Sequence, residues 1–303
     1  MRTWVAMLVG ALAACGSVAN DATGAGAGTI CDPAATFDAP AAVAGLNTAD
    51  VEGVPRLTPD ELELYFYFYA SGNAGGTADP NLRRAQRTSV DQPFGAAVAL
   101  PRVNTTAAEY DPSVSSDGLT LFFESNRVAG EGYHLYMSTR PSHAAEFEAP
   151  AELANVNSAS VTDTDEEPFV TADRQELWFA SNRAGGLGNV DIYRAEWNGA
   201  SFGNVVDVTS LSTSASDYYP TLSADKLTIY LSSTRPGGQG GYDIWTAHRS
   251  TTNDGFPPPK LVAELNSSGV EYVGWLSPDN CRIYFSSDRA GTFDIYVASR
   301  HPM

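Results

Sequence analysis

A fivefold repeat constrains the fold of this chain more than any other feature of its sequence. An aspartate recurs at spacings of 57, 56, 52 and 54 residues, and a Ser or Thr stands two positions before it in every copy. The five aspartates are Asp60, Asp117, Asp173, Asp225 and Asp279. A repeat of this length indicates copies of one supersecondary unit, each of which must bury its apolar face against a neighbour.

Each repeat carries the marks of short β-strands. A Pro or Gly five positions before the aspartate is expected to open a short strand, and the hydroxyl and the carboxylate are expected to bond nearby backbone groups and turn the chain. Three consecutive apolar residues follow, which predicts a strand buried on both faces, because a strand with one wet face would alternate. These triplets are Leu64-Tyr65-Phe66, Leu121-Phe122-Phe123, Leu177-Trp178-Phe179, Ile229-Tyr230-Leu231 and Ile283-Tyr284-Phe285.

Four short strands can be recognised in units of about 55 residues. This predicts an all-β fold, a five-bladed β-propeller of four-stranded blades. The repeats cover about residues 51–100, 108–157, 164–212, 216–266 and 270–303. The last repeat lacks its fourth strand, and a matching pattern stands at residues 37–47, before the first repeat. We therefore expect the N-terminal strand to complete the last blade and close the ring, which leaves no open sheet edge between the chain ends.

The third and fourth repeats resemble a known family. The third contains Glu166-Glu167-Pro168, then Leu177 to Gly186, and ends in Asp191-Ile192-Tyr193, and a similar Gly-rich stretch stands at residues 237–245. These motifs resemble the WD-like repeats of TolB-type propellers and are similar to repeats of envelope proteins that carry OmpA-like domains. The resemblance covers about residues 31–303 and implies the propeller fold. TolB itself has six blades and an extra N-terminal domain, so the resemblance does not carry over its partners.

The first thirty residues predict export and a lipid anchor. Arg2 precedes an apolar run from Trp4 to Ala14, which is too short to span a bilayer, and the run leads into Cys15. Leu12 to Cys15 resembles the lipobox of bacterial lipoproteins, which implies a signal peptide at residues 1–14 and a lipid on Cys15. An ordinary signal peptide is the alternative. Residues 15–30 are then a flexible tether to one propeller domain at residues 31–303. Gly16 favours the outer membrane, on its periplasmic or its exposed side.

Two further cysteines, Cys31 and Cys281, stand near the two ends of the folded part. In an oxidising compartment they are expected to form one disulfide, which would fasten the N-terminal strand to the last repeat. Two distant cysteines and four scattered histidines do not make a zinc site. The sequence therefore predicts no metal and no cofactor.

A carboxylate lies eight residues before each turn aspartate. The five carboxylates are Glu52, Glu109, Asp165, Asp217 and Glu271. They stand at the entry to the innermost strand, so we expect them to form an acidic ring round one mouth of the central channel. Such a ring would hold a cation or a basic partner loop, unless each acid is neutralised by an arginine.

An arginine recurs in a Ser-x-Arg motif that follows the buried strand in four repeats. The four arginines are Arg127, Arg183, Arg235 and Arg289. A guanidinium can bind a carboxylate through two parallel hydrogen bonds. We expect a structural clamp to the turn aspartate, to the aspartate of the third strand or to the ring carboxylate.

No motif indicates catalytic residues. The four histidines share no position of the repeat, and no G-x-S-x-G motif is present. A pair of channel carboxylates acting as in a glycosidase is a weaker alternative, because active sites break the symmetry of a repeat and the ring acids obey it. The acidic run from Thr162 to Glu167 fits no EF-hand loop and is expected to be a solvated blade edge. We therefore expect that the protein is not an enzyme.

Net charge and the predicted anchor direct the functional interpretation. The chain has 18 Lys and Arg against 36 Asp and Glu, a net charge of -18, which disfavours nucleic acid as a partner. The interpretation is a non-catalytic cell-envelope lipoprotein whose propeller is a scaffold for an unidentified envelope protein and which meets the membrane only through its lipid. The alternatives are a carbohydrate- or ion-binding module and a glycoside hydrolase.

Overall fold

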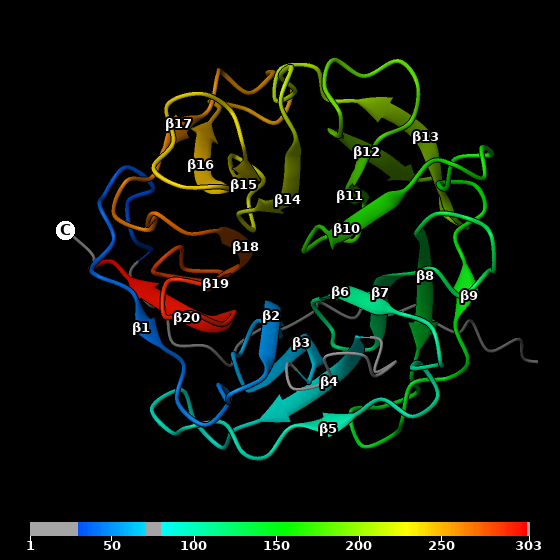
Figure 1. The fold of residues 1–303 in the computed structure, drawn as a ribbon, viewed down its shortest axis with the longest axis horizontal. Coiled ribbons are helices and arrows are strands. Elements are labelled where there is room, and N and C mark those ends of the chain that lie inside the picture. Colours follow the sequence, from blue (N-terminus) through cyan, green and yellow to red (C-terminus); the bar gives the residue numbers. More distant parts are fainter. Residues whose placement is uncertain (1–29, 71–79, 302–303) are drawn as a thin grey trace, which may run out of the picture.

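The computed structural model describes residues 30–70 and 80–301, and all regular secondary structure in these ranges is β. Twenty strands form five antiparallel four-stranded sheets, arranged round a central axis as the blades of a propeller (Figure 1). The predicted five-bladed all-β propeller is confirmed. Within the same ranges no helix is long and apolar enough to cross a membrane. The predicted signal peptide, Cys15 and all of the tether except Ile30 lie outside the described residues.

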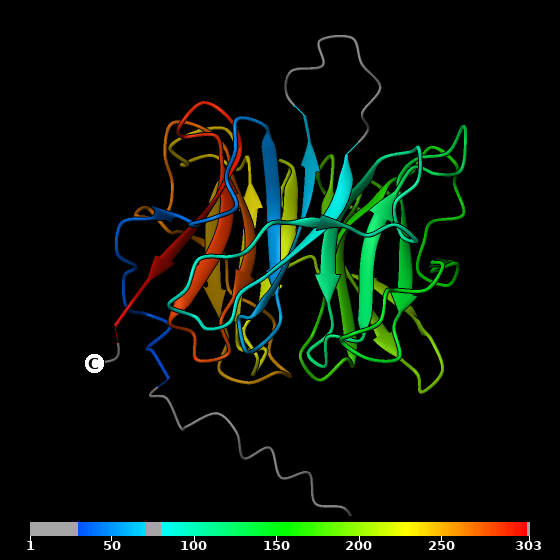
Figure 2. The same ribbon diagram turned by 90° about the horizontal axis from the view of Figure 1, so that it is seen from below.

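The first strand of each repeat lies innermost, and the other strands follow outward (Figure 1). The strands stand side by side along the thickness of the disc (Figure 2). Blade 1 consists of β2 (Val51–Leu57), β3 (Glu63–Tyr69), β4 (Asn81–Gln86) and β5 (Val98–Ala99), and blade 2 of β6 (Glu109–Val114), β7 (Thr120–Ser125), β8 (His134–Thr139) and β9 (Ala151–Glu152). Blade 3 consists of β10 (Asp165–Val170), β11 (Glu176–Ser181), β12 (Asp191–Trp197) and β13 (Phe202–Asp207). Blade 4 consists of β14 (Asp217–Leu222), β15 (Thr228–Ser233), β16 (Asp243–His248) and β17 (Lys260–Leu261), and blade 5 of β18 (Glu271–Leu276), β19 (Arg282–Ser287), β20 (Asp294–Ser299) and β1 (Ala41–Ala42).

The conserved spacing of hydroxyl and aspartate builds the turn between the two inner strands of each blade. In blade 1 the hydroxyl of Thr58 donates to the Asp60 carboxylate at 2.6 Å, and the same carboxylate oxygen accepts the backbone N–H of Leu62 at 3.0 Å. The other four blades repeat both contacts. The predicted turn is thus confirmed, and its polar groups are satisfied locally.

The apolar triplets form the core between neighbouring blades. In blade 1, Leu64, Tyr65 and Phe66 are at most 1% exposed, although adjacent residues of a strand point to opposite faces. One core cluster contains Phe122 of blade 2 and Phe179 of blade 3, so it joins two blades. Burial on both faces follows from this face-to-face packing, as the triplets predicted.

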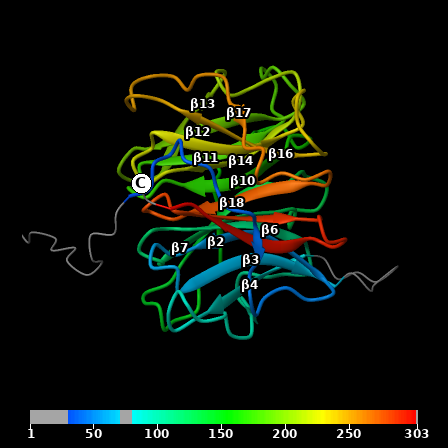
Figure 3. The same cartoon turned by 90° about the vertical axis from the view of Figure 1, so that its left-hand side faces the viewer.

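The ring closes between the two ends of the described chain. In β1, Ala41 pairs with Val297 and Ala42 with Tyr296 of β20. Figure 3, seen from the side of blade 5, shows the blue N-terminal segment beside the red strand of this blade. The predicted disulfide between Cys31 and Cys281 is present, and the two Cα atoms are 5.1 Å apart. The last blade is therefore fastened both by a strand and by a covalent bond.

The innermost strands differ from the prediction in where they begin. The Pro or Gly is not the first residue of these strands. Four of them begin at the acidic residue three positions before the Pro or Gly, and β2 begins at Val51. Each contains a β-bulge at its middle, as between Glu166 and Phe169 of β10. Proline is tolerated there because an innermost strand is a sheet edge that has no strand partner on its channel side.

Candidate functional site

The five acids of the predicted ring are buried inside the blades and are not among the residues that line the central cavity. Each is at most 1% exposed and is bound by the preceding loop. The hydroxyl of Thr105, for example, donates to Glu109 at 2.5 Å, and the backbone N–H of Ser158 donates to Asp165 at 2.6 Å. Equivalent contacts hold Glu52, Asp217 and Glu271. Each ring acid, at or next to the start of an innermost strand, therefore fastens a loop and is not part of the cavity wall.

The four predicted clamp arginines bind these same acids. Arg127 lies 3.2 Å from Glu109, and Arg235 lies 2.6 Å from Asp217. The other two pairs are Arg183 with Asp165 at 2.5 Å and Arg289 with Glu271 at 3.2 Å. Of the three partners that the sequence left open, the structure selects the ring carboxylate. In blade 1 the position of the arginine is occupied by Ala70. The side chain of Glu52 accepts hydrogen bonds from the backbone N–H and the hydroxyl of Thr48. Burial raises the pKa of Glu52.

In blades 2 to 5, residues one or two positions after the ring acids form part of the wall of the central cavity. The cavity has a volume of about 300 Å³. Its walls are Tyr67, Tyr110, Asp111, Glu124, Tyr133, Glu166, Glu167, Tyr218, Tyr219, Tyr242 and Tyr272. Successive residues of a regular strand point to opposite faces, so Glu166 and Glu167 share one cavity only because of the bulge. Glu167 and Asp111 accordingly have the unusual φ values of 52° and 48°.

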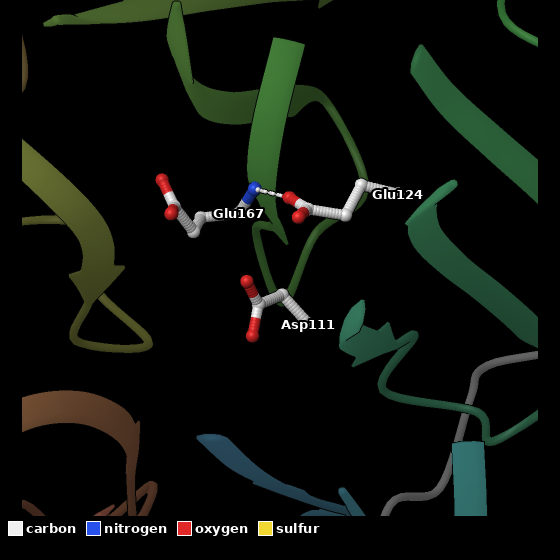
Figure 4. Close-up of side chains that lie close together, drawn as sticks. All are labelled: Asp111, Glu124 and Glu167. Carbon is white, nitrogen blue, oxygen red and sulfur yellow. Dashed lines mark hydrogen bonds between the residues drawn. The ribbon is translucent and has the colours of Figure 1, made fainter. Parts of the chain in front are cut away.

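Three carboxylates meet inside this cavity. Asp111 and Glu124 come from blade 2, and Glu167 comes from blade 3 (Figure 4). Each is at most 4% exposed, and one oxygen of each lies within 4.8 Å of the others. The backbone N–H of Glu167 donates to Oε2 of Glu124 at 2.6 Å. In the described part of the chain, Oδ1 of Asp111 and Oε2 of Glu167 have no hydrogen-bond partner, so two acceptors are available to a ligand.

Burial favours the protonated form of these acids. It raises the pKa of Asp111 to about 8, although the Arg56 guanidinium favours the ionised form. Burial, together with nearby carboxylates, raises the pKa of Glu124 and Glu167 well above the usual range. The pKa of Glu166, on the cavity wall, is raised to about 7, again chiefly by burial. The group therefore holds protons at neutral pH that isolated carboxylates would lose.

Arg56 of β2 crosses the channel next to this cavity. The side chain is 2% exposed. Its Nη1 donates to the hydroxyl of Thr221 at 2.8 Å and to the backbone carbonyl of Gly274. The guanidinium carbon lies 5.2 Å from the centre of the Phe169 ring. These contacts reach blades 4, 5 and 3. Its Nε and Nη2 have no partner among the residues described, and burial lowers its pKa to about 10. Arg56 lines a second pocket together with Leu57 and Phe169.

The expected solvated edge at residues 162–167 is corrected by the structure. Asp165 is fully buried and Glu167 is 4% exposed, because β10 begins at Asp165 and carries the end of the acidic run into the channel. The sequence reasoning also missed Asp111 and Glu124. The sequence did contain a signal for them. The residue two positions after the ring acid changes between apolar, acidic and aromatic types from one repeat to the next, unlike the ring acid itself. The occupants of this position are Val54, Asp111, Glu167, Tyr219 and Val273.

Comparison with known proteins gives relatives in structure only. No family model matches the chain, and no curated protein matches it. TolB from Acinetobacter baumannii is 20% identical with a TM-score of 0.46, and the match covers 85% of this chain but only 56% of that one. TolB from Agrobacterium tumefaciens, described as putative in its name, is 16% identical with a TM-score of 0.50 over 82% of this chain and 73% of that one. The structural neighbours thus include TolB propellers, as the resemblance of the repeats implied.

Glycoside hydrolases share the fold as well. A family 117 glycoside hydrolase from Zobellia galactanivorans is 9% identical with a TM-score of 0.56, over 88% of this chain and 90% of that one. An arabinofuranosidase from Podospora anserina and a family-43 glycoside hydrolase have TM-scores of 0.50 and 0.52. At these identities the likeness shows the fold alone. The prediction that the protein is not an enzyme is corrected by these neighbours. It rested on the absence of a catalytic motif, and the same fold occurs in glycoside hydrolases that this chain resembles in structure.

Proposed function

We propose that the protein is a glycoside hydrolase that acts in the central cavity. The observation that carries the proposal is the group of buried carboxyls, Asp111, Glu124 and Glu167, inside a tyrosine-lined pocket. Glycoside hydrolysis uses two carboxyl groups, one that protonates the leaving oxygen and one that attacks the sugar or activates water. Unlike the ring acids, these three residues break the symmetry of the repeat.

Glu167 is the proposed general acid. Burial and the neighbouring carboxylates raise its pKa, which favours the protonated carboxyl that a general acid requires. Its Oε2 has no partner in the described ranges and is available to a leaving-group oxygen. Glu124 accepts the backbone N–H of Glu167, so we assign it the role of a positioning residue.

Asp111 is the proposed nucleophile. The nucleophile is the ionised form of Asp111, which Arg56 favours although burial raises the pKa to about 8. Its Oδ1 is also without a partner among the described residues. Inverting enzymes hold their carboxyl groups about 6.5–9.5 Å apart, whereas retaining enzymes hold them about 5–5.5 Å apart. One oxygen of each carboxyl lies within 4.8 Å of the others, which is compatible with the shorter separation, and we propose the retaining course. Asp111 would then attack the anomeric carbon, and Glu167 would activate the water that releases the glycosyl group.

Sugar hydroxyls fit the polar atoms that the cavity leaves unpaired. A sugar hydroxyl can donate a hydrogen bond to Oδ1 of Asp111, which is without a partner among the described residues. A metal ion could bind only the carboxylate oxygens of this group. The tyrosine rings provide the apolar walls that small-molecule sites commonly have.

Hydrolysis of small glycosides tests the proposal. We expect the purified protein to release 4-nitrophenol from at least one member of a panel of neutral, acidic and amino 4-nitrophenyl glycosides. Asp111→Asn and Glu167→Gln should each lower kcat by about 100-fold or more, and Glu167→Gln should lose most on substrates with poor leaving groups. Glu148→Gln is the matched control, since Glu148 is 57% exposed and pairs with Arg102 on the surface. The absence of hydrolysis across the panel, or full activity in both cavity variants, would contradict the proposal.

The location in the cell is a separate proposal that rests on the lipobox-like sequence. We propose that a lipid on Cys15 anchors the protein in the bacterial envelope, with the outer membrane favoured. Cys15→Ser should move the protein from the detergent phase to the aqueous phase of a phase-separated extract. Retention of the variant in the detergent phase would rule out the anchor. The envelope protein partner stays a prediction.

A further inference from the structure

Among the residues that directly follow the ring acids, one carboxylate stands with tyrosines on the cavity wall. The residues directly after the ring acids are Gly53, Tyr110, Glu166, Tyr218 and Tyr272, in blades 1 to 5. All except Gly53 line the cavity. Glu166 is therefore the charged member of an otherwise aromatic set, and it lies outside the catalytic group proposed above.

Two matching aromatic pairs stand on either side of Glu166. In blade 2 the rings of Tyr110 and Tyr133 are 5.9 Å apart at an interplanar angle of 67°. In blade 4 the rings of Tyr218 and Tyr242 are 5.6 Å apart at 69°. Blades 2 and 4 are the two neighbours of blade 3, which carries Glu166 (Figure 1). Tyrosine rings and a carboxylate in one cavity are groups that attract an organic ammonium ion.

The acidic residues of the cavity also favour a positively charged ligand. Asp111, Glu124 and Glu167 lie beside Glu166, and Arg56 is the basic residue described next to them. Oδ1 of Asp111 and Oε2 of Glu167 are unpaired, and both residues are more than nine-tenths buried. An acidic ligand would be repelled here. A cationic ligand would take the place of the protons that the carboxyls now hold.

A small metal ion fits this cavity less well than an ammonium group. Ring faces do not coordinate Ca²⁺ or Mg²⁺, which need several oxygen ligands in place of their water. An ammonium group can donate hydrogen bonds to a carboxylate and also rest against tyrosine rings.

We propose that the Glu166 side of the cavity binds an ammonium group and that the substrate is a glycoside of a sugar with a free amine. The second half of this inference rests on the proposed hydrolase function, whereas ammonium binding does not. Glu166 pairs with the amine, and the tyrosines of blades 2 and 4 flank it.

Calorimetric titration with glucosamine, glucose, N-acetylglucosamine and glucuronate tests the inference. We expect glucosamine to bind at least 10-fold more tightly than glucose or N-acetylglucosamine, and glucuronate not to bind. Glu166→Gln should remove the preference for glucosamine, and Glu148→Gln should keep it. Thermal unfolding of Glu166→Gln provides the control for its fold, and Tyr218→Phe, which keeps the ring, should retain the preference.

Each outcome separates the two proposals. Equal binding of glucose and glucosamine, or no binding of glucosamine, overturns the ammonium site even if neutral glycosides are hydrolysed. Selective binding of glucosamine that depends on Glu166 supports the site, and a lack of hydrolysis of amino-sugar glycosides would then count against the hydrolase alone. Calcium chloride that displaces glucosamine and raises Tm at millimolar concentration would mark a metal site instead and overturn the inference.

Discussion

At pH 8 the variant Asp111→Asn is expected to be more stable than the wild-type protein by about 2 kcal/mol or more, and to have lost its hydrolase activity. Burial raises the pKa of Asp111 from 3.8 to about 8, so the fold favours the neutral carboxyl. Asparagine has nearly the same shape and carries no charge at any pH. The variant therefore escapes the cost of ionising a buried acid beside Glu124 and Glu167.

The sign of the pH dependence follows from proton binding. Between about pH 4 and pH 8 the folded protein keeps a proton on Asp111 that the unfolded chain has lost, so the free energy of unfolding falls as the pH rises. The stability that this group contributes is complete below about pH 4 and is lost as the pH passes about 8. The difference between variant and wild type should grow over the same window. A gain of 2 kcal/mol corresponds to roughly 4–8 °C in Tm.

Denaturant unfolding at pH 5 and pH 8 measures this effect. Glu148→Gln removes an exposed carboxylate and should change the stability by less than about 0.5 kcal/mol at either pH. A wild-type protein whose stability is the same at pH 5 and pH 8 would show that the cavity acids are not held neutral. So would an Asp111→Asn variant that is less stable than wild type at pH 8.

Removal of residues 31–47 is expected to prevent cooperative folding of the propeller. The segment adds β1 to blade 5, and it buries Phe37, Val43 and Leu46 to at most 7% exposure. Each such side chain contributes about 1.5–3 kcal/mol of burial free energy. Together with the lost strand pairing and disulfide, this approaches the whole stability of an ordinary domain.

A milder change separates the contribution of the disulfide from that of the N-terminal strand. The double variant Cys31→Ser with Cys281→Ser should fold, with a loss of about 2–5 kcal/mol, because β1 and its apolar contacts remain. Circular dichroism and denaturant unfolding of both forms provide the measurement. A truncated protein that unfolds in a single sharp transition near the wild-type Tm would mean that the N-terminal segment does not close the ring.

Much of the fold could be predicted because its interactions are local to each repeat. The turn between the two inner strands depends on Thr58 and Asp60, two residues apart, and on their equivalents in the other blades. The double-sided burial of Leu64 to Phe66 follows from a run of three apolar residues. The strand at Ala41 was predicted because its pattern repeats one that occurs later in the chain.

The candidate site was missed because the sequence pattern was interpreted for regular strands. Every repeat has an acid at the position of Glu109 and Asp165, and this recurrence led to the prediction that these acids lie at the channel. Each instead fastens a loop, and they pair with Arg127 and Arg183 respectively. The cavity is lined instead by the residues that follow them, such as Asp111. A bulge changes the direction of a side chain, and spacing alone does not show a bulge.

The sequence by itself determined the number of blades, the order of their strands and the closure of the ring, since these depend on a repeated local pattern and on contacts that every copy makes in the same way. Only the tertiary structure decided which residues face the axis. Asp111 and Glu167 are 56 residues apart, and Glu124 lies on a second strand. The face-to-face packing of blades 2 and 3 brings these strands together, and the backbone at φ values of 48° and 52° turns Asp111 and Glu167 into one cavity. The packing of the whole propeller holds this conformation, which local sequence preference opposes.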